Sequence, residues 1–185
     1  MINVTDARRG ATVELDGELY QVMEFEHIKM GRGSAQVRLK LKDVRGGHTV
    51  DRTFQATAKL ARVRVERQPC QYLYQDGELY YFMNTETYDQ IPLNLNQVGD
   101  AINYLTENAS CELLTYGDEP IGVELPAAVV LAVAESDPGV KGDTAQGATK
   151  PAKLESGLVV QVPLFINPGE KLKIDTRSGQ YLERA

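Results

Sequence analysis

The feature that most constrains the fold is a pair of strand-like runs joined by a short loop with two glycines. Residues 35–42 alternate strictly between polar and apolar side chains, and residues 18–28 place apolar side chains among polar ones. Period-two alternation favours a β-strand with one buried face. A short glycine-containing connection between two such runs predicts a β-hairpin. The connecting loop consists of Lys29, Met30, Gly31, Arg32, Gly33 and Ser34.

The tip of this expected hairpin carries an isolated cation. Because Gly31 and Gly33 have no side chains, we expect the guanidinium of Arg32 to stand exposed at the apex with backbone N–H groups beside it. A lone cation on an extended arm suits insertion into a phosphate-lined or crowded RNA crevice. An ordinary solvent-exposed hairpin has the same pattern, so the loop alone leaves both interpretations open.

Composition bounds the class of protein. A length of 185 residues accommodates one large domain or two to three small ones, and 16 glycines and 8 prolines favour many short strands. Cys70 and Cys111 lie in separate polar contexts without a Cys-x-x-Cys pair or a histidine at zinc-ligand spacing, so we expect unpaired, reduced thiols and no metal site. Without an apolar run of membrane-spanning length or a signal-peptide pattern, we expect a soluble cytoplasmic protein.

Charge is distributed unevenly, although the net charge is only −6. Residues 1–64 contain 12 basic and 8 acidic residues, residues 65–127 contain 1 and 11, and residues 128–185 contain 7 of each. A cationic end and an anionic middle predict a restricted orientation on RNA, because phosphate repels the acidic segment. A solubilising acidic surface explains the middle segment as well. The basic residues of the expected strand at 35–42 share one face: Arg38, Lys40 and Lys42.

Turn signals divide the chain into three segments: residues 1–64, 65–127 and 128–185. We predict that each segment forms a small β-barrel. Short strands with one small helix are typical of oligonucleotide-binding barrels. The helix is expected at residues 98–105, where apolar residues recur at i, i+3, i+4 and i+7. Strands are expected at 12–15, 18–28, 35–43, 50–54, 61–65, 71–74, 78–83, 88–93, 109–116, 120–125 and 127–135.

The pentapeptide Asp-Gly-Glu-Leu-Tyr occurs twice, at residues 16–20 and 76–80. Asp-Gly between apolar runs is a strong signal for a two-residue hairpin turn. We therefore expect Asp16-Gly17 and Asp76-Gly77 to form turns, each followed by a strand. Chance reuse of a good hairpin sequence explains the repeat as well as duplication does.

The most specific stretch is residues 150–170, KPAKLESGLVVQVPLFINPGE. Its spacing of Lys, Ala, Gly, Val-Pro, Ile and Gly resembles the signature of bacterial elongation factor P, a family of translation factors. The resemblance covers the whole chain. Residues 29–34 fall at the functional tip of that family, residues 83–90 at its second-domain hairpin, residues 142–144 at its third-domain loop and residues 181–184 at its C-terminal end.

The resemblance implies an all-β, L-shaped molecule with a tRNA-like outline, built from an SH3-like barrel of the KOW type and two OB-fold barrels. It implies a monomer, without cofactor, metal or membrane association, that binds the 70S ribosome between the P and E sites through ribosomal RNA and proteins. There it would position the P-site peptidyl-tRNA when consecutive prolines stall synthesis, because the proline ring restricts the nascent chain. It would therefore not be an enzyme itself.

The resemblance also assigns roles within the first domain. Lys29 and Arg32 would contact phosphate and ribose of the P-site tRNA. Family members often carry a modified Lys or Arg at the position of Arg32. An arginine excludes lysine-specific β-lysylation and leaves either rhamnosylation by an Arg-modifying glycosyltransferase or no modification. Met30 stands where many members have proline, which leaves the rigidity of the tip open.

Two further groups of residues receive roles in the third domain. Gly142, Asp143 and Thr144 would approach the E-site codon of the mRNA, with Asp143 accepting hydrogen bonds from base amino groups. Tyr181 and Arg184 would contact ribosomal RNA or tRNA. Without the resemblance, an exposed Asp is an ordinary turn former. The pattern is equally consistent with Tyr181 as a core residue and Arg184 as a solvent-exposed one.

Three alternatives compete with this interpretation. An enzyme is disfavoured, because His27 and His48 belong to no catalytic or metal-binding pattern and the chain has no phosphate-binding or dinucleotide fingerprint. A generic RNA-binding module should be basic throughout, unlike this chain. A paralogue within the same family that acts on other stall sequences remains open.

Overall fold

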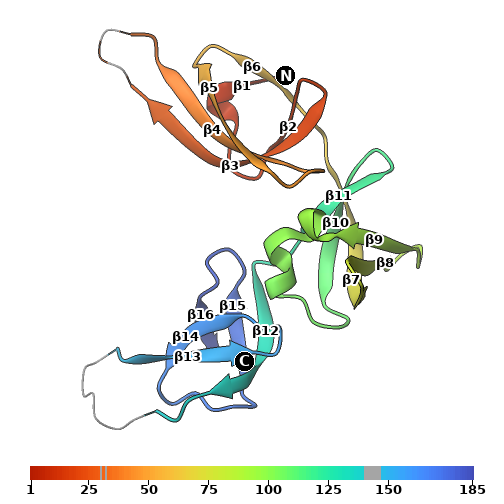
Figure 1. The fold of residues 1–185 in the computed structure, drawn as a ribbon, viewed down its shortest axis with the longest axis vertical. Helices are drawn as coiled ribbons and strands as arrows, with labels where there is room; N and C mark the ends of the chain where they lie inside the picture. The colour runs from red at the N-terminus through yellow and green to blue at the C-terminus, as the bar shows by residue number, and fades with distance from the viewer. Residues whose placement is uncertain (30, 32, 140–146) are drawn as a thin grey trace. The chain divides into compact units, whose positions relative to one another are not determined.

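The structure, a computed structural model, describes residues 1–29, 31, 33–139 and 147–185 (Figure 1). It consists of three β-sheets of six, five and five strands, whose strands come from residues 2–62, 66–124 and 128–184. The predicted all-β class is confirmed. The chain divides into two compact units: residues 1–68, 93–99 and 113–122 form the first, and residues 69–92, 100–112 and 123–185 form the second.

The first sheet has the order β1-β6-β2-β3-β4-β5 and carries the hairpin expected from the sequence. Burial in its strand β4 alternates as predicted, with Val37, Leu39 and Leu41 facing the core. Its strands are β1 (Ile2–Asn3), β2 (Thr12–Leu15), β3 (Glu18–Ile28), β4 (Gln36–Asp43), β5 (Thr49–Gln55) and β6 (Lys59–Arg62). Its core consists of Val4, Ala7, Val13, Val22, Val37, Leu39, Leu41 and Leu60.

A β-bulge explains why strand β3 lacks the clean alternation of its partner. The antiparallel register with β4 shifts between Val22 and Glu24, which leaves Met23 as an extra residue. Before the bulge Tyr20 and Val22 face the core, and after it Phe25 does. One inserted residue therefore changes which positions point inward, as expected for a side-chain period of two.

The first unit also contains a second apolar cluster, formed by Leu19, Val63 and Ile121. A bidentate ion pair accompanies it: Arg45 Nε donates to Glu119 Oε1 at 2.8 Å and Arg45 Nη2 donates to Glu119 Oε2 at 2.9 Å. This hydrogen bonding holds the pKa of the Glu119 carboxyl below its usual value. Contacts between residues about 75 positions apart thus hold the β4–β5 connection to the start of β11 (Glu119–Glu124).

The second sheet has the order β11-β10-β7-β8-β9. Tyr72 and Phe82 pack with ring centroids 5.4 Å apart. Its remaining strands are β7 (Glu66–Asp76), β8 (Leu79–Asn84), β9 (Gln90–Asn94) and β10 (Ser110–Tyr116). The buried hydrophobic side chains on these four strands are Cys70, Tyr72, Tyr80, Phe82, Leu93, Cys111 and Leu113.

The two copies of Asp-Gly-Glu-Leu-Tyr form different turns. In the first copy Leu15 pairs with Glu18, so Asp16 and Gly17 are the central residues, both with positive φ (53° and 82°), as in a type I′ turn. In the second copy Asp76 pairs with Leu79, so the turn is Gly77-Glu78. The expected Asp76-Gly77 turn is therefore wrong by one residue.

This shift has a direct consequence for burial. The leucine of the first copy, Leu19, is 2% exposed, whereas the equivalent Leu79 is 39% exposed and the neighbouring Tyr80 is buried. A shift of one residue in pairing turns every following side chain to the opposite face of the sheet. The same five residues thus serve two different cores.

The helical prediction is correct in kind and wrong in extent. The α-helix α1 spans Leu95–Val98, and a 3₁₀-helix, η2, follows at Gly99–Asn103. A capping box starts the helix before the predicted position, since Asn94 Oδ1 accepts from Gln97 N and Gln97 Oε1 accepts from Asn94 N. Gly99, with φ of +58°, ends it. Periodicity alone identified Val98 and Leu105 as inward-facing residues. It did not identify the capping box or Gly99, which set the two ends of the helix.

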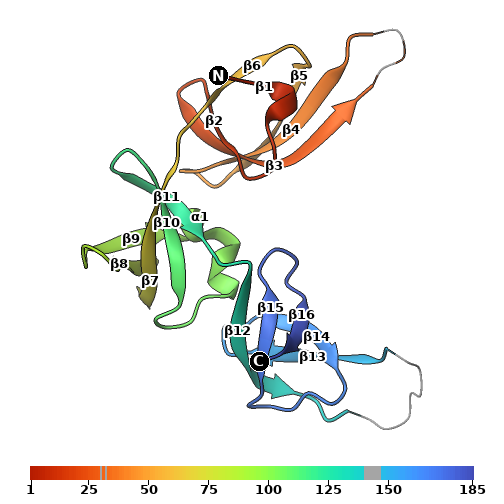
Figure 2. The same cartoon turned by 180° about the vertical axis from the view of Figure 1, so that it is seen from behind.

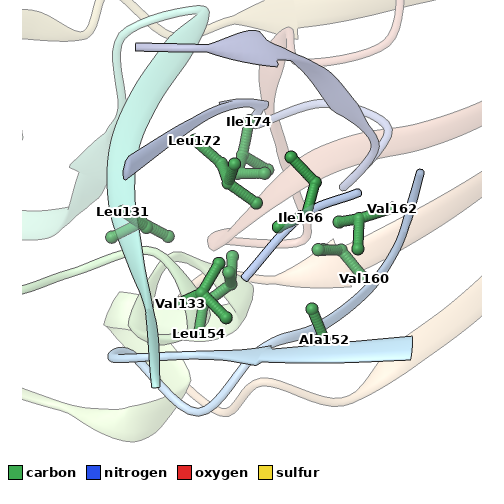
Figure 3. Close-up of a cluster of buried hydrophobic side chains, with 9 residues drawn as sticks. All are labelled: Leu131, Val133, Ala152, Leu154, Val160, Val162, Ile166, Leu172 and Ile174. Atoms are coloured by element: carbon green, nitrogen blue, oxygen red, sulfur yellow. The ribbon is translucent and has the colours of Figure 1, made fainter. Parts of the chain in front are cut away.

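The third sheet has the order β14-β13-β12-β15-β16 and surrounds the core drawn in Figure 3. Tyr104 and Tyr181 pack against that core from its edge. The strands are β12 (Ala128–Ser136), β13 (Thr149–Leu154), β14 (Val159–Pro163), β15 (Lys171–Asp175) and β16 (Tyr181–Arg184). The core consists of Leu131, Val133, Ala152, Leu154, Val160, Val162, Ile166, Leu172 and Ile174.

Candidate nucleic-acid interface

The β3–β4 hairpin presents the predicted tip loop. Its register runs from Tyr20 opposite Asp43 to Ile28 opposite Gln36, and strand β5 pairs with β4 from Gln55 opposite Gln36 to Thr49 opposite Lys42 (Figures 1 and 2). The described loop residues Lys29, Gly31, Gly33 and Ser34 are all exposed. Two other predicted tip residues, Met30 and Arg32, lie outside the described residues.

Gly31 has open space around it. A Cβ atom added at this position would meet nothing within 4 Å, and the residue has no positive φ that would favour glycine. Neither steric crowding nor backbone conformation therefore requires glycine here. The absence of a side chain leaves the backbone open to close approach by another molecule.

Two of the three cations on the predicted basic face are paired with acids of neighbouring strands. Arg38 Nη2 lies 3.5 Å from Asp51 Oδ2, and Lys40 Nζ lies 3.3 Å from Glu24 Oε1. The local field is therefore weaker than the count of basic residues indicated. Exposed pairs of this kind contribute little to stability.

The third-domain loop and the C-terminal residues are placed differently. Gly142, Asp143 and Thr144 lie outside the described residues, between strands β12 and β13. At the base of that connection, Lys150 is buried and its Nζ donates to the backbone oxygen of Asp137 at 2.6 Å. This contact fixes the start of β13 against the end of β12.

Tyr181 and Arg184 both lie on strand β16 but have different surroundings. Tyr181 pairs with Ile174 and packs against the core, which agrees with its interpretation as a structural residue. The guanidinium of Arg184 lies over the Phe165 ring at 5.1 Å, and its Nη1 is 3.3 Å from Glu170 Oε1. The Arg184 side chain is nevertheless 58% exposed.

Glu170 acts as an acceptor for two groups at this site. Its carboxylate accepts from the backbone N–H of Asn167 at 2.7 Å and from Arg184, and these bonds lower the pKa of Glu170 from its usual value. Arg184 thus has a preformed position on the surface, held by an aromatic ring and a carboxylate.

The sequence interpretation missed one contact altogether. The expectation that Cys70 and Cys111 have separate polar surroundings is wrong, because both are buried and their Sγ atoms lie 2.9 Å apart. Over the described parts of the chain, no group of three or more His, Cys, Asp or Glu residues could hold a metal ion. Among the same residues no helix is long and apolar enough to cross a membrane.

Comparison with known proteins matches three family models along the chain. The elongation factor P KOW-like domain matches residues 3–60, its OB domain matches residues 65–123, and its C-terminal domain matches residues 129–184. The chain belongs to the elongation factor P family. It is 55% identical to "Elongation factor P" of Moorella thermoacetica over 185 residues and 53% identical to that of Pelotomaculum thermopropionicum over 184, covering 100% of both chains in each case.

Elongation factor P proteins are translation factors, and the KOW-like and OB domain types of the first two sheets are those expected. Among solved structures, "Eukaryotic translation initiation factor 5A from Methanococcus jannaschii" has a TM-score of 0.48 and 20% identity, covering 68% of this chain and 90% of that one. The family assignment stands on the full-length relatives.

The stretch that identified the elongation factor P family is mainly structural. In residues 150–170, Lys150 and five apolar residues are buried, and the apolar ones contribute more than half of the third core (Figure 3). Those five are Ala152, Leu154, Val160, Val162 and Ile166. The signature therefore specifies the third barrel, whereas Arg184, a described residue expected to touch RNA, lies on its surface.

Proposed function

We propose that this chain is a translation elongation factor that binds the ribosome between the P and E sites and promotes peptide-bond formation at polyproline stalls. Its partners are the RNA and proteins of the 70S ribosome, the P-site tRNA and the E-site codon of the mRNA. The observation that carries the proposal is the match of three elongation factor P domain models along the whole chain. The factor positions the P-site peptidyl-tRNA and has no catalytic centre of its own.

The hairpin geometry supports a reaching role for the tip. Strand β3 has 11 residues, so at the usual rise of a β-strand it extends up to roughly 36 Å. Hydrogen bonds to β4 keep the arm extended, and its described tip residues are exposed. An extended, paired arm loses less conformational entropy on insertion into a crevice than a flexible loop would.

The chemistry required of the tip is positioning. Proline is a poor substrate because its ring fixes φ and limits the orientations of the nascent chain. A cation at Lys29 or Arg32 that contacts phosphate or ribose of the tRNA restrains the acceptor end and favours a reactive geometry. Most other residues reach that geometry unaided, so the factor has little barrier to lower for them. The effect is therefore selective for proline runs.

The third barrel supplies the second set of proposed contacts. Gly142, Asp143 and Thr144 approach the E-site codon, where Asp143 accepts hydrogen bonds from base amino groups. Of the two predicted contact residues on strand β16, Arg184 has the more exposed side chain, because Tyr181 packs against the core. Contact of Arg184 with phosphate requires exchange of its ion pair with Glu170.

Modification of the tip follows from its chemistry. An arginine at position 32 offers a guanidinium to an Arg-modifying glycosyltransferase and no amine to a β-lysylating enzyme. Intact mass of the protein from its native host distinguishes rhamnosylated from unmodified Arg32, since a deoxyhexose adds a defined mass to the tip peptide.

The proposal is tested in a reconstituted translation system with a Pro-Pro-Pro message and a matched proline-free message. Arg32→Ala should slow synthesis through the proline run and leave the proline-free message unaffected. Arg32→Lys keeps the charge but loses the planar fork, so its rate should fall between those of wild type and Arg32→Ala. Arg38→Ala removes the same charge from the flanking strand and serves as the matched control.

Two results would contradict the proposal. If Arg32→Ala supported synthesis through the proline run at the wild-type rate, Arg32 at the tip would have no role in the mechanism. Equal losses with Arg32→Ala and Arg38→Ala would indicate that overall charge on the hairpin, and not a contact at its tip, determines activity. Thermal unfolding of each variant checks the fold, which should barely change because exposed surface substitutions have small effects.

A further inference from the structure

The second sheet brings two cysteines together that are separated by 40 residues in the sequence. Cys70 on β7 and Cys111 on β10 are 2% and 6% exposed, and their Sγ atoms are 2.9 Å apart. Both are free thiols in this structure. No part of the proposed ribosomal function uses them, and they lie in a different barrel from the tip loop.

The pairing of the strands places the two residues opposite each other. Strands β7 and β10 are neighbours in the sheet, and Tyr72 N donates to Ala109 O at 3.0 Å. Asn108 N also donates to Tyr72 O at 2.7 Å, so both backbone groups of Tyr72 bond to one short segment, as in an antiparallel pair. Moving two residues back from Tyr72 and two forward from Ala109 therefore reaches Cys70 and Cys111. Directly opposed residues of antiparallel strands have Cα atoms about 4.5–5.5 Å apart. A disulfide accepts Cα separations of about 4.4–6.8 Å, so the backbone already meets its main requirement.

The surroundings of the two thiols are unequal. A cavity of about 370 Å³ is lined by Ser110, Cys111, Glu112, Glu124, Leu125 and Pro126. Cys111 lines this cavity and Cys70 does not, so we expect a small reagent to approach Cys111 first. The hydrogen bond between the two sulfur atoms lowers the pKa of Cys70 and raises the pKa of Cys111. Acidity therefore opposes a first attack by Cys111 and access to the cavity favours it, so we expect that first step to be slow and to become faster as pH rises.

We propose that Cys70 and Cys111 form a thiol–disulfide modification site whose co-reactant is a low-molecular-weight disulfide. Cys111 Sγ loses its proton and attacks one sulfur of the reagent, whose S–S bond breaks, and the released thiolate takes up that proton. Cys70 Sγ then loses its proton and attacks Cys111 Sγ, forming the internal disulfide and releasing the second thiolate, which is protonated in turn. Two protein thiols are oxidised and the reagent is reduced to two thiols.

The product joins neighbouring strands within the second sheet. The new bond closes a loop from residue 70 to residue 111 and restricts the unfolded chain without requiring a change in strand pairing. Oxidised protein should therefore unfold at a higher temperature than reduced protein, and dithiothreitol should reverse the shift.

The test uses the full chain, first reduced and desalted, then incubated with 2-hydroxyethyl disulfide at mildly alkaline pH. Wild type should lose the mass of two hydrogen atoms and retain no adduct, and peptide mapping should join Cys70 to Cys111. The matched variants separate the two roles. Cys70→Ser should retain the reagent as a stable mixed disulfide on Cys111, and Cys111→Ser should remain unmodified over the same time because Cys70 does not line the cavity.

Several outcomes would overturn the proposal. If the folded wild-type chain kept both thiols under conditions that oxidise the urea-unfolded chain, the pair would be inert in the folded protein. A persistent adduct on wild type, or a disulfide between two molecules, would show that the second attack does not occur. Equal modification rates of Cys70→Ser and Cys111→Ser would contradict the assigned order. If a serine variant does not fold, the proposal is tested on wild type alone, by its mass, its peptide map and the change in its melting temperature on oxidation.

Discussion

Gly47 offers a sharp test of how the first unit is held together. It follows strand β4, has φ of +73°, and lies against the first turn of helix α1. A Cβ atom added here would lie 2.6 Å from Cγ and Oδ1 of Asn96 and 3.0 Å from its Cβ. Asn96 Nδ2 also donates to the oxygen of Gly46 at 3.3 Å. We therefore expect Gly47→Ala to destabilise the first unit by two separate effects.

The two effects have different sizes and different origins. A non-glycine residue in the left-handed region costs about 1–2 kcal/mol. Relief of the contact with Asn96 requires its backbone to move, because rotation of the side chain does not displace its Cβ, and overpacking of this kind costs about 1–3 kcal/mol. Gly47→Ala should therefore lower the free energy of unfolding by roughly 2–5 kcal/mol.

Gly17→Ala is the matched control for the conformational effect. Gly17 lies in the same unit and has φ of +82°, but a Cβ there meets nothing within 4 Å. It should cost only the conformational part, about 1–2 kcal/mol. Calorimetric unfolding of both variants measures the difference, at about 2–4 °C per kcal/mol for a chain of this size.

A double-mutant cycle isolates the steric effect. Asn96→Gly removes all three atoms that the new Cβ would meet. In that background, Gly47→Ala should cost no more than Gly17→Ala does in the wild-type chain, so the coupling energy should be at least about 1 kcal/mol. Equal costs of Gly47→Ala and Gly17→Ala in the wild-type background would refute the close approach of Asn96, as would a coupling energy near zero.

Two further predictions concern the pH dependence of the third barrel and the overall dimensions. Asp175 Oδ1 accepts from the backbone N–H groups of Ser178 and Arg177, which lower its pKa from the usual value of about 3.9. A carboxyl group whose pKa is lower in the folded state adds stability that is complete above the unfolded-state pKa and is lost as pH falls through the folded-state pKa. The melting temperature of Asp175→Asn should therefore fall less between pH 7 and pH 3 than that of wild type. An equal fall in both proteins would contradict this assignment. The expectation of an L-shaped molecule, which comes from the sequence resemblance alone, predicts a radius of gyration well above the value of about 16 Å for a compact chain of this length, and small-angle scattering near that value would oppose it.

Local sequence patterns predicted the elements more reliably than their ends. The alternation at residues 35–42 gave strand β4 and its inward face, because side chains of period two bury one face whatever their distant partners. The second Asp-Gly turn was misplaced by one residue. Turn chemistry allows either Asp76-Gly77 or Gly77-Glu78 as the centre, and the observed register buries Tyr80 instead of Leu79. That choice depends on the rest of the barrel, which a pentapeptide does not encode.

The candidate site shows the same limit more strongly. Exposure at the tip is a local property: the two glycines predicted exposed backbone beside Arg32, and Gly31 and Gly33 are exposed. The partners of the basic face were not predictable in this way, since the contact of Arg38 with Asp51 depends on how β4 pairs with β5. The proximity of Cys70 and Cys111 depends on the pairing of β7 with β10, which are separated in the chain by two other strands. No spacing rule along the chain detects a contact of that kind.

The position of the family signature separates residues that specify the fold from residues that we propose contact a partner. Ala152 and Val160 are buried, and a change in their size would open or overfill the third core. No comparable requirement acts on Gly31, since a side chain would fit there without strain. Substitutions in the signature should therefore reduce activity through stability, whereas substitutions at the tip should reduce activity with the fold intact. Measuring both quantities for the same variants distinguishes the two classes of residue.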